Sequence, residues 1–253
     1  MSLFADSQAS HNHSLNVLNH LQEYDEFMES IQTVVDLGCG DGRDLEWWAT
    51  RMTREDDPKP LNINCTGVDV LETPGLIKQY SNITYQPTSF EDKIHTPKDR
   101  KFDVLWSHDS FQYAINPIQT LNNWWHLASD GGMLVLIVPQ TTNIHRNKIA
   151  FTQESGCYYH YSMVSLIHML AVNGWDCKSG FFLKNPLDPW LHAIVYKSNT
   201  EPMNPRTTTW HDLSASGLLP TSAEKSIYAH GELYQHELVL PWLDQGLRDL
   251  GQL

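Results

Sequence analysis

The sequence predicts an α/β protein built on a doubly wound, mainly parallel sheet of seven strands. Short β-branched or apolar segments alternate with segments of helical period between residues 31 and 199. The first apolar segment also runs directly into three closely spaced glycines, which is typical of a strand-to-helix turn at a ligand site. The last two expected strands are joined by a short turn and should be antiparallel to each other. An N-terminal helix and a C-terminal extension complete the expected architecture.

Residues 1–30 are expected to form a tail followed by one helix. The first dozen residues are polar, so we expect them to be mobile, and we assign no metal site to His11 and His13. Ser14 is placed to cap a helix that runs to about Ser30. Apolar residues near the helical period indicate this helix: Leu15, Leu18, Leu21, Phe27 and Ile31.

The first half of the main domain contains four expected strands. The β-branched run at 33–37 predicts a buried parallel strand, and a helix over 44–52 follows it. The charged segment 53–62 contains Pro58 and Pro60 and is expected to be a loop. The remaining segments of this half are a strand, a short helix and two further strands, at 63–70, 75–80, 83–86 and 102–106.

The second half contains the most apolar strand. A helix over 118–128 precedes Gly131-Gly132, which should turn the chain into a strand over 133–138. A helix over 162–172 should end at Asn173-Gly174, a common C-terminal stop. The final strands, 175–183 and 191–197, complete a main domain that we expect to span 31–199.

Beyond residue 199 the pattern changes. Pro202, Pro205 and three successive threonines make an irregular stretch, and segments 223–240 and 242–250 are helix-forming. We expect residues 200–253 to be an extension that packs on the main domain.

Composition narrows the function classes. The 253-residue chain is 41% hydrophobic and contains nine Trp, ten Tyr and eight Phe, which excludes a wholly disordered chain. Seventeen Lys and Arg against thirty Asp and Glu give a formal charge of −13, which argues against nucleic-acid and anionic-membrane partners. Four cysteines without a C-x-x-C pair favour a reducing compartment over a disulfide scaffold or a cysteine zinc site.

The location expected from the sequence is the cytoplasm. No run of about 18 apolar residues predicts a transmembrane helix. Residues 1–14 show no charged region followed by an apolar run, so no signal peptide is expected.

The glycine-rich turn is the strongest functional signal. Asp36 precedes the turn, and Gly38, Gly40 and Gly42 follow at alternate positions. A dinucleotide fingerprint would be G-x-G-x-x-G, whereas here Arg43 follows the third glycine. Asp36 and Asp41 would repel a pyrophosphate but suit a ligand that bears an ammonium and a sulfonium group.

This segment resembles the first motif of class I S-adenosylmethionine-dependent methyltransferases. The resemblance covers about residues 33–197 and implies a Rossmann-like fold with S-adenosyl-L-methionine as cofactor. It implies that the glycines pass under the methionine part of the cofactor and that Asp69, after the second strand, accepts hydrogen bonds from both ribose hydroxyls. The cofactor site that it implies comprises Asp36, Gly38, Cys39, Gly40, Asp69, Val70, Ser89, Phe90 and Ser107.

The adenine contact departs from the family pattern. Ser89 stands where an acid is common, so either its hydroxyl or the backbone of Phe90 replaces the contact to the adenine amino group. Phe90 either covers the adenine face or belongs to the core. Ser107 and His108 emerge at the end of the fourth strand, beside the expected methyl group.

Transfer from a sulfonium methyl is an in-line displacement that needs alignment more than a covalent intermediate. A hydroxyl acceptor would need a base, and His108 is the candidate; otherwise it packs against the cofactor. No Asn-Pro-Pro-Tyr-like run follows the fourth strand, which argues against a nucleic-acid base or glutamine amide as acceptor. No acid cluster suggests a metal-dependent enzyme of the catechol type. Candidate acceptor-binding residues are Tyr113, Arg146, Tyr158 and Tyr159.

The sequence therefore predicts a methyltransferase that acts on a small molecule by N-, O- or carboxyl-methylation. Two alternatives stay open: a protein or RNA acceptor, and a nucleotide-cofactor-binding protein with other chemistry, such as an NAD-dependent dehydrogenase. The sequence does not identify the acceptor, the methylated atom or the oligomeric state.

Overall fold

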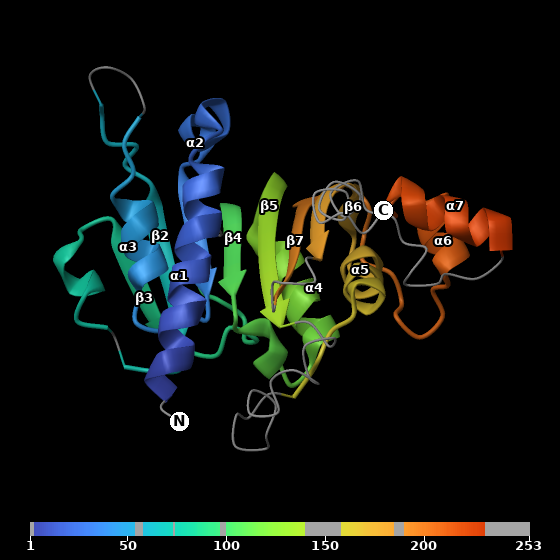
Figure 1. Cartoon of the computed structure of the whole chain (residues 1–253), viewed down its shortest axis with the longest axis horizontal. Helices are drawn as coiled ribbons and strands as arrows, with labels where there is room; N and C mark the ends of the chain where they lie inside the picture. The colour runs from blue at the N-terminus through green and yellow to red at the C-terminus, as the bar shows by residue number, and fades with distance from the viewer. Residues whose placement is uncertain are drawn as a thin grey trace, which may run out of the picture.

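A seven-stranded sheet with the strand order β3-β2-β1-β4-β5-β7-β6 organises the molecule (Figure 1). The computed structural model describes residues 3–53, 58–72, 74–96, 100–139, 158–184 and 190–230. The strands are β1 (Thr33–Leu37), β2 (Asn64–Asp69), β3 (Ile83–Pro87), β4 (Phe102–His108), β5 (Ala128–Pro139), β6 (Trp175–Lys184) and β7 (Trp190–Lys197). Only β7 runs against its neighbours, β5 and β6, and the other pairs are parallel, as predicted.

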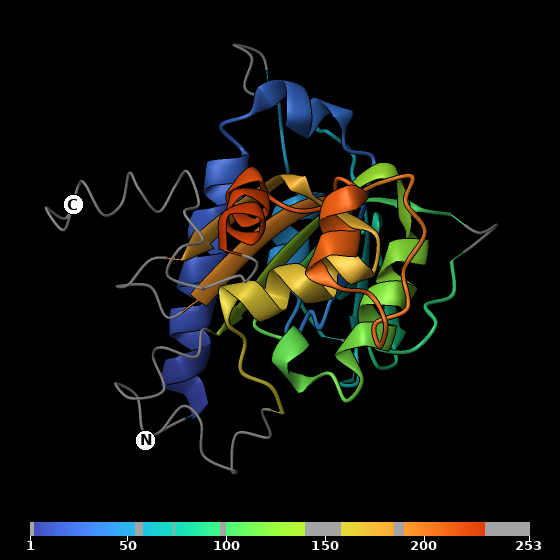
Figure 2. The same cartoon turned by 90° about the vertical axis from the view of Figure 1, so that its right-hand side faces the viewer.

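Helices cover both faces of the sheet (Figures 1 and 2). Alternate residues of β5 enter opposite cores, because Leu134 and Leu136 face one side while Val135 and Ile137 face the other. α4 (Pro117–Leu127) and α5 (Met163–Val172) cover the first core, and α1 (Leu3–Leu21), α2 (Asp25–Ser30) and α3 (Arg43–Ala49) cover the second. This burial on both faces explains why the central strands are almost continuously apolar.

The N-terminal segment differs from the expectation. Residues that we expected to be a mobile tail are helical from Leu3, and the single predicted helix is divided between α1 and α2. Ser14 lies inside α1 rather than at its start, so its assignment as a helix cap is wrong. Its hydroxyl donates to the Asp44 carboxylate at 2.8 Å, and the Asn19 amide oxygen accepts from Trp47 at 3.1 Å. These contacts to α3 attach α1 to the domain. Local sequence patterns do not predict them, because they join residues far apart in the chain.

The start of β5 also differs. Gly131 and Gly132 were expected to form a turn, but both lie within β5, which begins at Ala128 directly after α4. A Cβ on Gly132 would lie 2.8 Å from the Ser129 carbonyl oxygen and 2.9 Å from that of Phe102. Close backbone approach therefore explains this glycine. The predicted stop of α5 at Asn173 and Gly174 is confirmed, with Gly174 at a φ of 82°.

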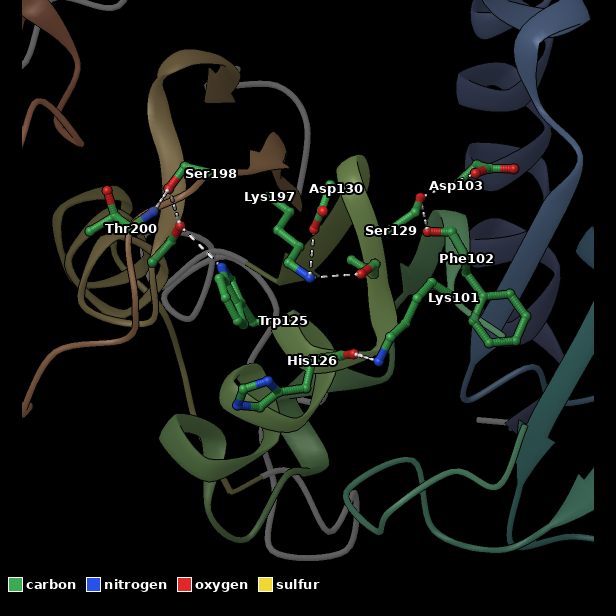
Figure 3. A network of polar contacts seen from close by, with 12 residues as sticks. Lys101, Phe102, Asp103, Trp125, His126, Ser129, Asp130, Lys197, Ser198 and Thr200 are labelled. Carbon is green, nitrogen blue, oxygen red and sulfur yellow. Dashed lines mark hydrogen bonds and ion pairs between the residues drawn. The ribbon is translucent and has the colours of Figure 1, made fainter. Parts of the chain in front are cut away.

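Lys197, the last residue of the antiparallel strand β7, binds the start of β5 (Figure 3). Its ammonium donates to the Ala128 carbonyl at 3.0 Å, pairs with Asp130 at 3.3 Å and lies 4.4 Å above the ring of Trp125. Ser129 adds hydrogen bonds from β5 to the start of β4. This network lies at the edge opposite the carboxyl ends of the parallel strands, so we assign it to stability.

The described part of the C-terminal segment packs on α5 and β6. It contains α6 (Trp210–Ala215), which was not predicted, and α7 (Thr221–His230). Leu213 and Leu219 are fully buried in the core on the α5 side, and Cys177 of β6 donates its backbone N–H to Leu218. The predicted helix at 242–250 lies outside the described residues. We keep 1–30, 31–199 and 200–253 as a proposed division of the chain.

Among the described residues, the helices are too short or too polar to cross a bilayer.

Candidate functional site

The three glycines after β1 are required for different reasons. Their φ angles are all positive, 90° at Gly38, 52° at Gly40 and 85° at Gly42, which favours glycine at each position. A Cβ on Gly38 would lie 2.4 Å from the Cβ of Ser110, and one on Gly42 would lie 2.4 Å from a methyl group of Ile77. A Cβ on Gly40 would meet no atom within 4 Å. Of the three, only Gly40 therefore faces open space.

Asp69, the last residue of β2, lies against this turn. Its carboxylate accepts from the backbone N–H of Gly40 at 2.9 Å and from that of Leu71 at 3.0 Å. The first two N–H groups of the turn bind the Val68 carbonyl, at 2.8 and 3.2 Å. Val70, the next residue, is 72% exposed at the same rim. The structure therefore brings together the predicted acid, the predicted turn and an exposed apolar side chain.

Acidic side chains surround the turn. Burial raises the pKa of Asp36 well above its usual value, and the carboxylates of Asp44, Asp69 and Asp41 raise it further. Burial likewise raises the pKa of Asp44 on α3. A cation beside the turn would favour the ionised form of these carboxyl groups, and in that form they would repel a pyrophosphate.

A hollow of about 450 Å³ opens beside Gly40. This volume lies within the range of about 300–1,000 Å³ that is usual for small-molecule sites. Arg43 and Asp41, which form an ion pair at 2.8 Å, lie on its wall. The full lining comes from the turn and from the segment after β2: Gly40, Asp41, Arg43, Leu71, Glu72, Pro74, Gly75 and Leu76.

Two predicted cofactor residues support the turn from inside the core. Ser107 is fully buried, and its hydroxyl lies 2.9 Å from that of Ser110, which donates to the Leu37 carbonyl at 2.7 Å. Cys39 is 8% exposed, and its sulfur lies 2.9 Å from where a Cβ on Gly67 would stand. Burial raises the pKa of the Cys39 thiol. These side chains fix the shape of the turn.

Ser89 and Phe90 follow β3. The Ser89 hydroxyl accepts from the backbone N–H of Glu91 at 3.2 Å, so it already serves its own turn. The Phe90 carbonyl accepts from the Trp124 indole at 2.9 Å, and the two rings lie 6.1 Å apart. A Phe90 ring carbon also lies 3.6 Å from the position of a Cβ on Gly38. Phe90 is thus half-buried between α4 and the glycine turn.

His108 ends β4 beneath the first turns of α1, which reach the edge where the arrows of β4 and β5 end (Figure 1). Its Nε2 lies 2.8 Å from Nδ1 of His13, and its Nδ1 lies 3.4 Å from the hydroxyl of Ser10. His13 in turn stacks on Trp190 with ring centroids 4.1 Å apart and meets the edge of His192 at 4.9 Å. The predicted base therefore lies in an imidazole and indole cluster built by α1, β4 and β7.

Asp109 follows His108 with a strained backbone. Its φ of 53° is unusual for a residue with a side chain, and its N–H is held by the Ile137 carbonyl at 3.0 Å. Its carboxylate accepts from Gln112 at 2.7 Å and from Ser10 at 2.9 Å. Burial raises the pKa of Asp109, while hydrogen bonds from Ser10, Gln112 and Trp190 act in the opposite direction.

The predicted acceptor-binding tyrosines lie together beyond β4. Tyr158 and Tyr159 donate their backbone N–H groups to the Gln112 carbonyl, and the Tyr159 hydroxyl donates to the Ile115 carbonyl at 3.2 Å. Tyr113 in η3 (Phe111–Tyr113) is 40% exposed and Tyr158 is 64% exposed. Arg146 lies outside the described residues.

Sequence reasoning missed the contribution of α1 and β7. Ser10, His13, Trp190 and His192 carry no local signature, because only tertiary packing brings them to His108. The sequence shows Asp109 next to His108, but it does not predict that Ser10 of α1 connects their side chains. Within the described residues, no group of three or more His, Cys, Asp or Glu side chains is arranged to hold a metal ion.

Comparisons with known proteins agree with this geometry. Residues 29–179, more than half of the chain, match a family model described as a methyltransferase domain. No curated protein sequence matches the chain.

Solved structures of low sequence identity share the fold. The 1,6-didemethyltoxoflavin-N1-methyltransferase of Burkholderia thailandensis, crystallised with its namesake ligand and S-adenosylhomocysteine, is 14% identical; the match covers 78% of this chain and 82% of that one, with a TM-score of 0.54. The plantazolicin methyltransferase BpumL, in complex with a monoazolic desmethylPZN analog and SAH, is also 14% identical, with coverages of 76% and 89% and a TM-score of 0.55. A putative methyltransferase in complex with the Haloferax volcanii Trm112 activator is 16% identical, with coverages of 77% and 97% and a TM-score of 0.50.

These structural likenesses establish the fold, and the family model covers the glycine turn, Asp69 and His108 in one continuous match. The chain therefore belongs to the methyltransferase domain family.

Proposed function

We propose that this methyltransferase transfers a methyl group from S-adenosyl-L-methionine to a small-molecule acceptor at the carboxyl ends of the strands. S-adenosyl-L-homocysteine and an N-, O- or carboxyl-methylated compound are the products. The open space at Gly40, surrounded by acidic side chains and continuous with the hollow beside it, is the observation that carries the proposal. A cationic nucleoside fits such a space, because ligand atoms approach the backbone without meeting a Cβ.

The residues present fit this cofactor. Asp69 ends β2 with its carboxylate beside Gly40, where ribose hydroxyls can donate to it. Asp36 and the acids near it favour a ligand with ammonium and sulfonium charges. Phe90 lies beside the turn as a wall for the adenine. We propose the full set of contacts as Asp36, Gly38, Cys39, Gly40, Asp69, Val70, Ser89, Phe90 and Ser107, with Cys39 and Ser107 acting through the shape of the turn.

Alignment and proton removal are the tasks left to the protein. The bound cofactor supplies a methyl group that is already activated by the positive charge on sulfur. We assign His108 as the proton acceptor, because it stands at the end of β4 within hydrogen-bond reach of polar groups at the rim. An acceptor fixed between this rim and the cofactor gains the rate advantage of proximity.

The rim suits an apolar or aromatic acceptor. Among the described residues, eight large hydrophobic side chains are exposed, and six of these follow the carboxyl ends of β2 or β4 or pack beside them: Val70, Leu71, Tyr113, Ile115, Tyr158 and Tyr159. Aromatic faces bind flat or cationic ligands. The compounds bound to two structural neighbours, 1,6-didemethyltoxoflavin and a monoazolic desmethylPZN analog, support a small-molecule acceptor.

Charge and thiol chemistry support the remaining assignments. The formal charge of −13 disfavours RNA as the acceptor. Cys39, Cys65 and Cys177 are buried free thiols, which supports a cytoplasmic location.

Calorimetry tests the cofactor, and isotope transfer tests the acceptor. S-adenosylhomocysteine should bind with one-to-one stoichiometry and NAD should give no binding heat; binding of NAD alone would contradict the proposal. With methyl-labelled cofactor and a fractionated cell extract, the label should enter the small-molecule fraction. Label that enters only protein or RNA would overturn the acceptor class while leaving the cofactor assignment in place.

A further inference from the structure

A chain of polar contacts runs between α1 and the end of β4. Ser10 bridges two sequence neighbours, because its hydroxyl lies 2.9 Å from Oδ2 of Asp109 and 3.4 Å from Nδ1 of His108. On the other side of the imidazole, Nε2 of His108 lies 2.8 Å from Nδ1 of His13. His13, His108, Ser10 and Asp109 therefore form one connected sequence of donors and acceptors.

The direction of the chain follows from Asp109. Gln112 donates its amide N–H to Oδ1 at 2.7 Å, and Trp190 and Ser10 also donate to this carboxylate. These converging donors stabilise the ionised carboxylate against the effect of burial, and an ionised carboxylate only accepts hydrogen bonds. A serine has a single hydroxyl hydrogen. The hydrogen of Ser10 is consequently committed to Asp109.

The direction of the Ser10–Asp109 hydrogen bond favours one tautomer of His108. The Ser10 oxygen can then interact favourably with His108 only as an acceptor, so Nδ1 of His108 carries the hydrogen. Nε2 of His108 is then the basic nitrogen, and it accepts from Nδ1–H of His13. In the opposite tautomer, a lone pair on Nδ1 would face a lone pair of Ser10 across 3.4 Å.

The backbone of Asp109 shows that this arrangement is maintained at a cost. Its φ of 53° is disfavoured for a non-glycine residue. Gln112 also donates to the Asp109 carbonyl at 2.9 Å, and the Ile137 carbonyl holds its N–H. In this conformation the carboxylate accepts a hydrogen bond from Ser10 of α1.

We propose that Asp109 and Ser10 are positioning residues that hold His108 in its Nδ1–H tautomer, which makes Nε2 the atom that accepts the acceptor's proton. The inference rests on the proposed methyl transfer. The nucleophilic atom of the acceptor forms a bond to the methyl carbon, and the carbon–sulfur bond breaks with its electron pair remaining on sulfur. The acceptor's proton passes to Nε2 of His108 and then to solvent.

The tautomer also narrows the acceptor class. In this structure the single lone pair on Nε2 of His108 receives a hydrogen bond from His13. An acceptor must therefore take the place of His13, and a hydroxyl or N–H group presents the same kind of donor. A carboxylate presents no donor and would place a second lone pair against Nε2. The tautomer therefore favours a hydroxyl or N–H compound over a carboxylate as the acceptor.

Nitrogen-15 NMR of histidine-labelled full-length protein, saturated with S-adenosylhomocysteine, tests the tautomer directly. The wild-type protein should show His108 protonated at Nδ1. Asp109→Asn should move the His108 hydrogen from Nδ1 to Nε2. The Gln112 amide N–H still needs an oxygen acceptor, so the amide oxygen of the new Asn faces Gln112 and its NH₂ group faces Ser10. The Ser10 oxygen then accepts from that NH₂ group, and the Ser10 hydrogen points toward Nδ1 of His108. Ser10→Ala should lower the ratio of Nδ1–H to Nε2–H at least about fivefold, the equivalent of one net hydrogen bond.

Ser14→Ala is the matched control, because Ser14 also anchors α1 but binds Asp44 instead of the His108 chain. Its tautomer ratio should equal that of the wild type. A wild-type His108 protonated at Nε2, or a ratio unchanged in both Asp109→Asn and Ser10→Ala, would overturn the inference. If Ser10→Ala releases α1, as circular dichroism would report, the result with Asp109→Asn decides.

Calorimetry on the same proteins separates the two proposals. Ser10 and Asp109 are outside the proposed cofactor contacts, so both variants should bind S-adenosylhomocysteine within about twofold of wild type. If the wild-type protein does not bind S-adenosylhomocysteine, the proposed function fails whatever the tautomer. If it binds and the tautomer does not respond, only the positioning role of Asp109 and Ser10 fails.

Discussion

The backbone N–H of Gly40 donates to the Asp69 carboxylate at 2.9 Å, which joins the glycine turn to the end of β2. The same carboxylate holds the segment that follows, through the N–H of Leu71 at 3.0 Å. Asp69 therefore shapes both walls of the proposed cofactor site. Each carboxylate oxygen can accept more than one hydrogen bond, so these contacts leave it able to accept from ribose hydroxyls as well.

Replacement of Asp69 by Ala should weaken S-adenosylmethionine binding at least about tenfold, because charge-assisted hydrogen bonds to the ribose are lost and the turn loses its support. The measurement is the dissociation constant from calorimetry. Asp130→Ala is the control, since this exposed acid lies at the opposite edge of the sheet, and its affinity should match the wild type. Equal affinities in the two variants would refute the assignment of Asp69 to the ribose.

The open space at Gly40 gives a second prediction. Gly40→Ala places a methyl group where the cofactor is proposed to lie and should weaken its binding at least about tenfold, as expected for a contact that forces the ligand away. The backbone strain of alanine at positive φ should also lower stability by about 1 kcal/mol.

Gly131→Ala separates the two effects in Gly40→Ala. Gly131 also has a positive φ, 76°, and open space around it, but it lies at the start of β5, away from the site. This variant should lose similar stability in thermal unfolding and keep wild-type affinity for S-adenosylhomocysteine. If both variants lose affinity alike, the space at Gly40 is not where the cofactor binds.

The sheet could be predicted from the sequence because each strand carries its own local signal. The β-branched run of β1 and the apolar run of β5 need two buried faces, and only a sheet covered on both sides provides them. The glycine turn could also be predicted from the sequence, because positive φ angles favour glycine at those positions. Asp69 followed from its place at the end of β2.

The α1 side of the site could not be predicted in this way. Ser14 is a residue type that often caps a helix, yet its hydroxyl contacts the His11 carbonyl and the Asp44 carboxylate, and the helix extends back through it to Leu3. His13 reaches His108 across 95 positions of sequence, a contact without a local signal. Likewise, the role of Gly38 as a packing residue depends on Ser110, which the sequence does not place beside it.

Lys197 should matter for stability and not for ligand binding (Figure 3). Lys197→Met keeps the apolar stem but removes the hydrogen bond to Ala128 and the cation above Trp125, so unfolding free energy should fall by about 1–2 kcal/mol in denaturant titration. Lys178→Met is the control, because its exposed contact with Glu224 at 4.0 Å should contribute less than about 0.5 kcal/mol. A loss of cofactor affinity in Lys197→Met would contradict the separation of the two edges of the sheet.

Asp36→Asn should have opposite effects on the stability of the protein and on its affinity for the cofactor. The folded-state pKa of Asp36 is raised, first by burial and then by Asp44 and Asp69, so the folded protein holds the proton more tightly than the unfolded chain. Stability contributed by protonated Asp36 is therefore lost as pH rises from the usual aspartate value of about 4 toward the raised pKa. Asp36→Asn should raise the melting temperature at pH 8, with a gain that shrinks toward pH 4.

The same substitution should remove a pH dependence of cofactor binding. A cationic ligand favours the ionised form of Asp36, so binding of S-adenosylmethionine to the wild type should release a proton and tighten as pH rises. Calorimetry in buffers of different ionisation enthalpy measures that release. In Asp36→Asn the release should fall and the affinity should drop, whereas Asp130→Asn, at an exposed acid far from the turn, should behave as wild type. Equal proton release in wild type and Asp36→Asn would show that the carboxyl group of Asp36 does not respond to the ligand. The proposed place of the cofactor beside Asp36 would then be wrong.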